Sequence, residues 1–215
     1  MRIPLFNRLK KRLHVDIALL QDEVVDVVYG VSPKAVLHGG TAIWRCFAGN
    51  RFSEDLDFYL PDDKNFQKAF AGALNSRGLL LSKYKKTAST IFSKVSNGIA
   101  EVRFEASFRK PNGVEARPFE RADGNFMSVF TLRPEELLAE KAAAYSSRKL
   151  VRDIYDVYML SEAAASSKKL SEKAISLVEN AGKPLDEKTL KTIVFSGAVP
   201  SFEQMLIALQ RRLKK

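Results

Sequence analysis

The chain has 215 residues, of which 46% are apolar, so it can form one compact unit or two small, closely packed ones. Its single cysteine excludes an internal disulfide, and only two histidines accompany it, which argues against a structural zinc site. The sequence has neither the roughly 18–20 consecutive apolar residues that cross a bilayer nor the apolar stretch of a secretory signal. We therefore expect a cytoplasmic protein without membrane contact.

The charge is strongly positive, with a net value of +10 and an isoelectric point near 9.7. Such an excess favours polyanionic partners, because a protein that neutralises phosphates releases their counterions. Many basic proteins owe their charge to solubility alone, so charge by itself leaves contact with RNA open. The basic residues cluster at 8–12, 83–86 and 211–215.

The N-terminal part of the chain predicts helices around a first strand. Residues 4–28 carry apolar side chains at helical spacing and should be mainly helical. The apolar run 34–37 is typical of a strand, and residues 41–48 predict a short helix. Cys46 lies among large apolar residues of that helix, so we assign it to the core rather than to catalysis.

The middle of the chain predicts one helix and several strands. Apolar residues at helical spacing indicate a helix over 65–75. The turn at 96–98 suggests that the last two strands form a hairpin, and a basic loop is expected at 109–114. The predicted strands span 79–84, 90–95 and 101–108.

The last third predicts helices. Thr131 stands ahead of a proline and two glutamates, which is typical of a helix N-cap. Helical patterns continue to the end of the chain, with breaks at 182–184 and 197–200. The stretch 162–174 is expected to be a helix end and a loop.

Two aspartates separated by one residue begin a further predicted strand over 56–60. Side chains at positions i and i+2 of a strand point the same way, so Asp55 and Asp57 emerge on one face. Two adjacent carboxylates suit Mg²⁺, which takes one or two such ligands together with phosphate oxygens of a substrate. The pair therefore predicts a site for a metal and a nucleotide.

A Gly-Gly-Thr turn precedes these aspartates by about fifteen residues. Gly39 and Gly40 would let backbone N–H groups approach a phosphate, and Thr41 at a helix start could add its hydroxyl. The turn and the two aspartates together are the parts of a site that transfers or polymerises nucleotides.

The combination resembles the AbiEii/MenT-type nucleotidyltransferases, the toxin-like branch of the polymerase-β nucleotidyltransferase superfamily. The resemblance rests on Gly39-Gly40-Thr41 followed by Arg51-Phe52-Ser53-Glu54-Asp55-Leu56-Asp57-Phe58. It implies that Ser53 donates to a phosphate oxygen, and that Arg51 binds phosphate or pins the carboxylates. It also implies a metal held by Asp55 and Asp57, with Mg²⁺ expected and Mn²⁺ as the alternative, and an NTP as substrate.

The resemblance further implies a third metal carboxylate from a neighbouring strand. Residues 101–108 alternate, so Glu101, Arg103 and Glu105 share one face. Glu105 is the first candidate by position, and Glu101 is the second.

A second block, residues 134–148 and 151–158, is similar to the helical pattern of the same family. The resemblance implies that Lys141 contacts the triphosphate and that Asp153 is a catalytic or nucleotide-orienting carboxylate. On one unbroken helix these two residues would lie about 120° apart around the axis. We therefore expect a break near residues 146–148 and two helices that both face one cleft.

The predicted fold is α/β (α+β): a nucleotidyltransferase-type mixed sheet core with N-terminal helices over residues 1–127, then a C-terminal helical domain over 128–215 that completes the cleft. The predicted function is Mg²⁺-dependent transfer of NMP from an NTP to an acceptor. The resemblance implies tRNA as acceptor, a role as the toxin of a toxin–antitoxin or abortive-infection system, and a separate antitoxin. The alternatives are a protein-modifying nucleotidyltransferase, a glycosyltransferase that uses the two aspartates, and a non-catalytic nucleotide- or RNA-binding module.

Overall fold

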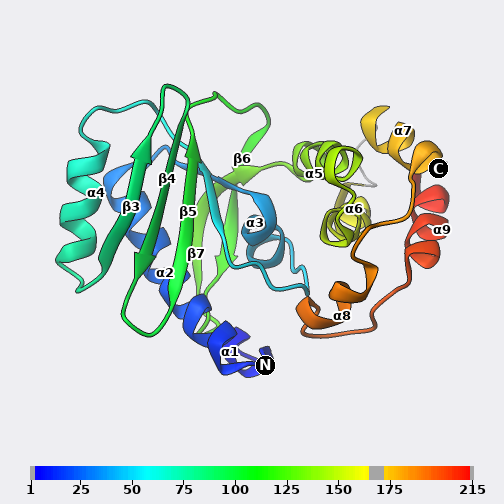
Figure 1. Ribbon diagram of the computed structural model, residues 1–215, viewed down its shortest axis with the longest axis horizontal. Helices are drawn as coiled ribbons and strands as arrows, with labels where there is room; N and C mark the ends of the chain where they lie inside the picture. The colour runs from blue at the N-terminus through cyan, green and yellow to red at the C-terminus, as the bar shows by residue number, and fades with distance from the viewer. Residues whose placement is uncertain (1–2, 165–171, 214–215) are drawn as a thin grey trace.

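A mixed sheet of seven strands forms one half of the molecule, and a group of helices forms the other (Figure 1). The computed structural model describes residues 3–164 and 172–213. The strands lie in the order β3-β4-β5-β2-β1-β7-β6. Their bounds are Val36–His38 (β1), Leu56–Tyr59 (β2), Leu80–Lys86 (β3), Thr90–Ser96 (β4), Glu101–Ser107 (β5), Val114–Glu120 (β6) and Phe126–Leu132 (β7).

The short central strands β1 and β2 lie between two groups of longer antiparallel strands, β3-β4-β5 and β6-β7. β1 pairs antiparallel with β2, whereas β2 pairs parallel with β5 and β1 pairs parallel with β7. The predicted mixed sheet is therefore confirmed. The predicted hairpin is present as the antiparallel pair β4–β5.

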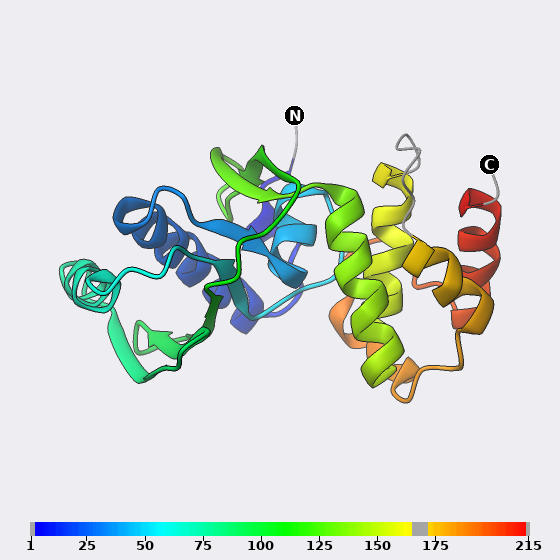
Figure 2. The same ribbon diagram turned by 90° about the horizontal axis from the view of Figure 1, so that it is seen from above.

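Helices α2 (Arg12–Val31), α3 (Gly39–Cys46) and α4 (Phe66–Asn75) cover one face of the sheet (Figures 1 and 2). Apolar positions of α2 such as Leu20, Val24 and Val28 are buried there because they share one stripe of the helix. The region 4–28, predicted to be mainly helical, contains two helices, since α1 (Leu5–Arg8) precedes α2. No helix of the described residues covers the other face of β3, β4 and β5 (Figure 2).

The C-terminal helices form a second lobe beside β1 and β7 (Figure 1). Its first two helices, α5 and α6, lie side by side, and Lys149 in the left-handed conformation ends α5. The predicted break between two helices is thus confirmed. The elements of this lobe are α5 (Pro134–Arg148), α6 (Val151–Ala164), α7 (Glu172–Asn180), the 3₁₀ helix η1 (Glu187–Thr189), α8 (Leu190–Ile193) and α9 (Phe202–Leu213).

Other predictions about this part of the chain had mixed outcomes. The breaks at 182–184 and 197–200 fall between helices, as expected. Within the stretch 162–174, residues 165–171 lie outside the described residues. No helix in the described ranges 3–164 and 172–213 combines the length and apolar character that a membrane crossing requires.

The strands β6 and β7 were not predicted, and the proposed N-cap was wrong. Thr131 is buried in β7, and Arg133 holds the cap position with Pro134 as the first residue of α5. Pro118 made β6 hard to recognise, but β6 is an edge strand, where a missing N–H is tolerated. The change from strands to helices lies at Arg133, so the expected boundary after residue 127 cuts β7.

Backbone pairing ties the two lobes together next to β2. The amide of Phe52 donates to the carbonyl of Ile193 at 2.8 Å, and the amide of Phe195 donates to Asn50 at 3.0 Å. Trp44 of α3 packs edge-on against both phenylalanines. The loop that leads into β2 is therefore held by the end of α8 and the residues after it.

Candidate active site

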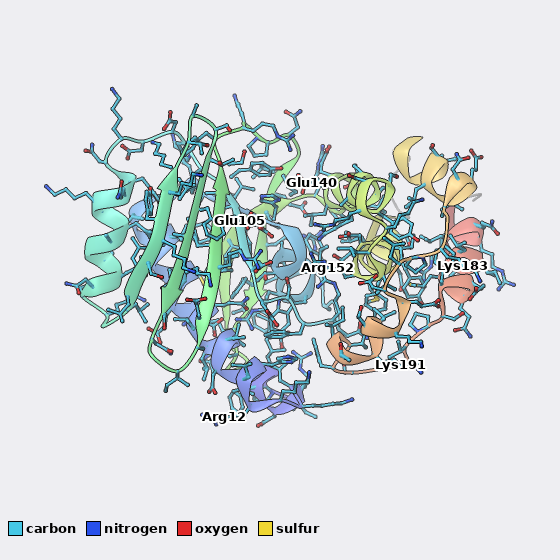
Figure 3. The ribbon with its side chains drawn as sticks, viewed as in Figure 1. Arg12, Glu105, Glu140, Arg152, Lys183 and Lys191 are labelled. Carbon is cyan, nitrogen blue, oxygen red and sulfur yellow. The ribbon has the colours of Figure 1, made fainter. Side chains whose placement is uncertain are left out.

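The sheet brings two predicted metal ligands, Asp57 and Glu105, into one row with His38 across β1, β2 and β5. His38 is the register partner of Asp57, and Asp57 is the register partner of Glu105. Glu105 therefore adjoins the aspartate pair, whereas Glu101 pairs with Ser96 at the far end of β5. Figure 3 shows Glu105 on the sheet and Glu140 on the facing helix α5.

Asp55 belongs to the same group of carboxylates. Arg103 connects it to Glu105, with Nε 3.4 Å from Asp55 Oδ1 and Nη1 3.6 Å from Glu105 Oε1. Burial raises the pKa of Asp57, and the charge of Asp55 adds to this although His38 and Lys141 oppose it. Burial and the charge of Asp57 likewise raise the pKa of Glu105. The carboxylates thus lie close enough to repel one another, and an added cation would relieve that repulsion.

The two glycines of α3 are required by the close approach of other groups, and Gly39 also by its backbone conformation. Gly39 has φ +71°, and a Cβ there would stand well inside van der Waals contact of Asp57 Oδ2. A Cβ on Gly40 would collide with Ser53 Oγ and with Arg51 Nη2. The start of α3 is therefore fitted against the loop and strand that carry the carboxylates, which leaves its N–H groups close to them.

Buried polar side chains hold the loop before Asp55 in place. Thr41 is fully buried and donates its hydroxyl to the carbonyl of Asp55, so it positions that aspartate instead of presenting its hydroxyl to a phosphate. Gln21 of α2 donates to the carbonyls of Ser53 and Glu54, at 2.9 and 3.1 Å. Gln21 was not predicted, although a glutamine on the apolar face of a helix is a usable signal.

A buried network of charges links the loop to α5 and α6. Arg51 donates from Nε and Nη2 to the two carboxylate oxygens of Asp156, at 2.6 Å each. Lys141 Nζ lies 3.0 Å from Asp156 and 3.8 Å from Asp153. Arg148 in turn binds both oxygens of Asp153, at 2.7 and 2.8 Å.

This network changes the interpretation of two predicted residues. The Arg51 guanidinium is buried against Asp156, which favours the alternative that it holds the site together over the one that it binds phosphate. Asp153 is fully buried and paired with two cations, so it orients Lys141 and Arg148 rather than reaching the cleft. Lys141 is placed on the cleft side of this network, near enough to Asp57 to lower the pKa of that aspartate.

A second cluster, which the sequence did not predict, lies on the other flank of Asp57. The rings of His38 and Tyr59 stack with centroids 4.0 Å apart, and both side chains contact Glu140 of α5. Arg109 donates to the Tyr59 hydroxyl at 2.7 Å. Burial would raise the pKa of Glu140, but hydrogen bonds from His38 and Tyr59 and nearby positive charge outweigh it and lower that pKa.

Comparison with known proteins identifies the family. The model of the family described as "Nucleotidyl transferase AbiEii toxin, Type IV TA system" matches residues 26–208. The chain belongs to the AbiEii family. Its members are nucleotidyltransferases, so the predicted enzyme class and family are confirmed.

The fold of this AbiEii protein recurs in two crystal structures from Helicobacter pylori. JHP933 is 19% identical with a TM-score of 0.68, and the match covers 95% of this chain and 91% of JHP933. A second protein, provisionally named a nucleotidyltransferase, is 20% identical with a TM-score of 0.61, covering 95% of this chain and 94% of the other. No curated protein matches in sequence.

Asp156 should make the stability of the protein depend on pH in the acidic range. Burial alone would raise its pKa, but Arg51 and Lys141 more than compensate and hold the pKa below the ordinary 3.8. A depressed pKa in the folded state stabilises the protein above the unfolded-state value, and this contribution is lost as the pH falls through the folded pKa. We expect Asp156→Asn to lower the free energy of unfolding by about 3–5 kcal/mol near neutral pH, because two buried cations lose their partner.

Urea unfolding between about pH 6 and pH 2 measures the free energy of unfolding of wild type and Asp156→Asn. The difference between the two free energies should shrink below about pH 4. Asp62→Asn is the control, since Asp62 is largely exposed and should change stability little. A difference that is constant over the whole range would contradict the assignment.

Gly39→Ala should disable the site without unfolding the protein. The added methyl group would push the Asp57 carboxylate away, and a displacement of about 1 Å can cost about 10²-fold in rate. Gly78→Ala is the matched control, because Gly78 has the same φ of +71° and nothing lies within 4 Å of a Cβ there. Circular dichroism and the rate of nucleotide transfer test the pair, and equal rates for both variants would refute the close-approach argument.

Proposed function

We propose that this AbiEii protein transfers NMP from an NTP to tRNA in a reaction that requires Mg²⁺, and that a separate antitoxin restrains it. The observation that carries the proposal is the group Asp55, Asp57 and Glu105 beside the glycine turn of α3, opposite Lys141. Carboxylates that could bind a metal and cations that could bind a triphosphate thus line the same cleft.

The donor set of the site fits Mg²⁺. Among the described residues, no three acidic, histidine or cysteine side chains stand ready to hold a metal ion by themselves. Mg²⁺ usually takes only one or two carboxylates and completes its shell with water and phosphate oxygens, so Asp55 and Asp57 with Glu105 beside them suffice once the NTP is present. The bound ion would neutralise charge on the carboxylates and on the phosphates, which is the chemistry it supplies.

The chain's own groups would bind and orient the triphosphate. Ser53 and the N–H groups at Gly39 and Gly40 lie at the start of α3, where the helix dipole favours an anion. Lys141 faces them and is held in place by Asp156, so it needs little reorganisation to bind a phosphate oxygen. In phosphoryl transfer, positioning and electrostatic stabilisation of this kind do most of the catalytic work.

The acceptor would approach over the open face of β3, β4 and β5. Lys85, Lys94 and Arg103 share that face with Glu105, as the strand registers require. The terminal basic clusters lie outside the sheet: Arg8 of α1 pairs with Glu120, and Arg212 of α9 bonds within the helical lobe. Arg12 and Lys183 also lie at the periphery, away from Glu105 (Figure 3).

Asp57→Asn should abolish transfer while the protein stays folded. The substitution keeps the shape of the side chain and removes one of several mutually repelling charges, so we expect unchanged or slightly higher thermal stability. The loss in rate should be at least on the order of 10²–10³-fold, as for other central electrostatic groups. Incubation with each labelled NTP, Mg²⁺ and total tRNA measures it.

Glu203→Gln is the control for that assay, because Glu203 lies in α9, away from the carboxylates of the sheet, and forms an ion pair with the peripheral Lys183. Normal transfer by Asp57→Asn would refute the site, and labelling of protein instead of RNA would support the protein-modifying alternative.

Binding of tRNA should depend steeply on salt and on the open sheet face. Affinity should fall by about 10³-fold or more between 50 and 200 mM salt if several phosphates are contacted. Lys85→Ala should reduce the slope of log affinity against log salt by about 1, whereas Lys188→Ala in η1 should not. Filter binding tests both variants, and absence of tRNA binding at low salt would assign the acceptor to another class.

A further inference from the structure

A cavity of about 640 Å³ lies beside His38, the register partner of Asp57, and nothing in the proposed transfer step uses it. Its walls come from the sheet, from α5 and from the loop between β5 and β6. We call it the Arg109 pocket. The residues that line it and enter the argument are His38, Tyr59, Arg109, Asn112, Glu136 and Glu140.

The inner wall of the Arg109 pocket is rigid. Glu140 accepts from the Tyr59 hydroxyl and lies 3.2 Å from His38 Nδ1, while Arg109 donates to the same hydroxyl. The stacked rings of His38 and Tyr59 close the remaining space. A wall fixed in this way can hold a ligand in one orientation without first becoming ordered.

The outer part of the pocket offers both donors and acceptors. The side chain of Arg109 is 72% exposed and that of Glu136 is 41% exposed, so both can exchange water for a ligand. Asn112 adds an amide, which can donate and accept. A cavity with a few convergent polar groups is typical of small-molecule sites, and this mixture suits the polar edge of a nucleobase.

The position of the pocket along β2 decides which part of a nucleotide it could reach. Side chains two residues apart on a strand are separated by about 6.5–7 Å and share one face. Ser53 lies before the aspartates in the chain, next to the glycine turn, and Tyr59 follows them. A nucleotide with its triphosphate near Ser53 and its transferred phosphate near Asp57 would therefore direct its nucleoside toward Tyr59.

Helix α5 supports the same orientation from the opposite side. Arg148 at its C-terminal end interacts with Asp57 and belongs to the cationic network, whereas Glu136 near its N-terminal end lines the pocket. Both walls of the cleft thus pass from groups that suit phosphates to groups that suit a base.

We propose that the Arg109 pocket binds the base of the NTP substrate and selects it through Arg109 and Glu136. This inference rests on the proposed function, because it requires a triphosphate between α3 and Lys141. Arg109 and Glu136 are specificity-determining residues, and neither contacts the reacting phosphate. A base that covers either group without pairing with it is rejected, since a polar group that loses water and gains no partner weakens binding.

Isothermal titration with the four NTPs and with inorganic tripolyphosphate, all with Mg²⁺, separates the two ends of the site. Wild type should prefer one base by at least about tenfold. Arg109→Ala and Glu136→Gln should each reduce that preference while tripolyphosphate binds as before. Lys141→Ala should instead weaken all NTPs and tripolyphosphate alike, by about tenfold to hundredfold.

Lys188→Ala is the matched surface control, and thermal unfolding checks that each variant is folded. Equal binding of all four NTPs by wild type, or an unchanged preference in both pocket variants, would overturn the inference and leave the proposed function intact. Failure of wild type to bind any NTP or tripolyphosphate would overturn the proposed function and the inference with it.

Discussion

The site depends most on one buried carboxylate, Asp156. It accepts two hydrogen bonds from Arg51 of the loop before β2 and lies 3.0 Å from Lys141 of α5. Burying these charges is costly, so each of them is stable only while the others are present. Because Arg51 and Lys141 belong to different lobes, the same interaction that neutralises the charges also sets the width of the cleft.

The carboxylates on the sheet show the opposite arrangement. Asp57 and Glu105 are neighbours across two strands, and their pKa values are raised because burial and mutual repulsion disfavour their charged forms. One side of the cleft therefore has its charges balanced internally, whereas the other has negative charge that a bound cation can stabilise. Such uncompensated charge costs stability and is typical of a binding site.

The sequence predicted which residues form the candidate active site better than it predicted their roles. The Gly-Gly-Thr turn, the aspartate pair and the two helices that follow Pro134 are local patterns, and each predicted element exists. Thr41 and Asp153 were expected to face the nucleotide, and for Arg51 this was one of two alternatives. Their partners come from distant parts of the chain, so a local pattern could not reveal that all three are buried.

The strands β6 and β7 were missed for a similar reason. The proline in β6 is acceptable only at a sheet edge, which depends on the strand order of the whole sheet. Glu140 and Arg109 converge on Tyr59 from two further elements, and no spacing in the sequence indicates this. The unpredicted part of the site is thus the part that long-range packing creates.

The backbone pairing between residues 50–52 and 193–195 has a consequence for synthesis of the toxin. The strands that carry the carboxylates emerge from the ribosome early, but the loop before Asp55 gains its backbone partners at 193–195 only when Phe195 has emerged. At about 5–20 residues per second, that interval is on the order of ten seconds. An unfinished or prematurely terminated chain therefore holds the chemical groups of the site without the last backbone contacts that fix the loop before Asp55.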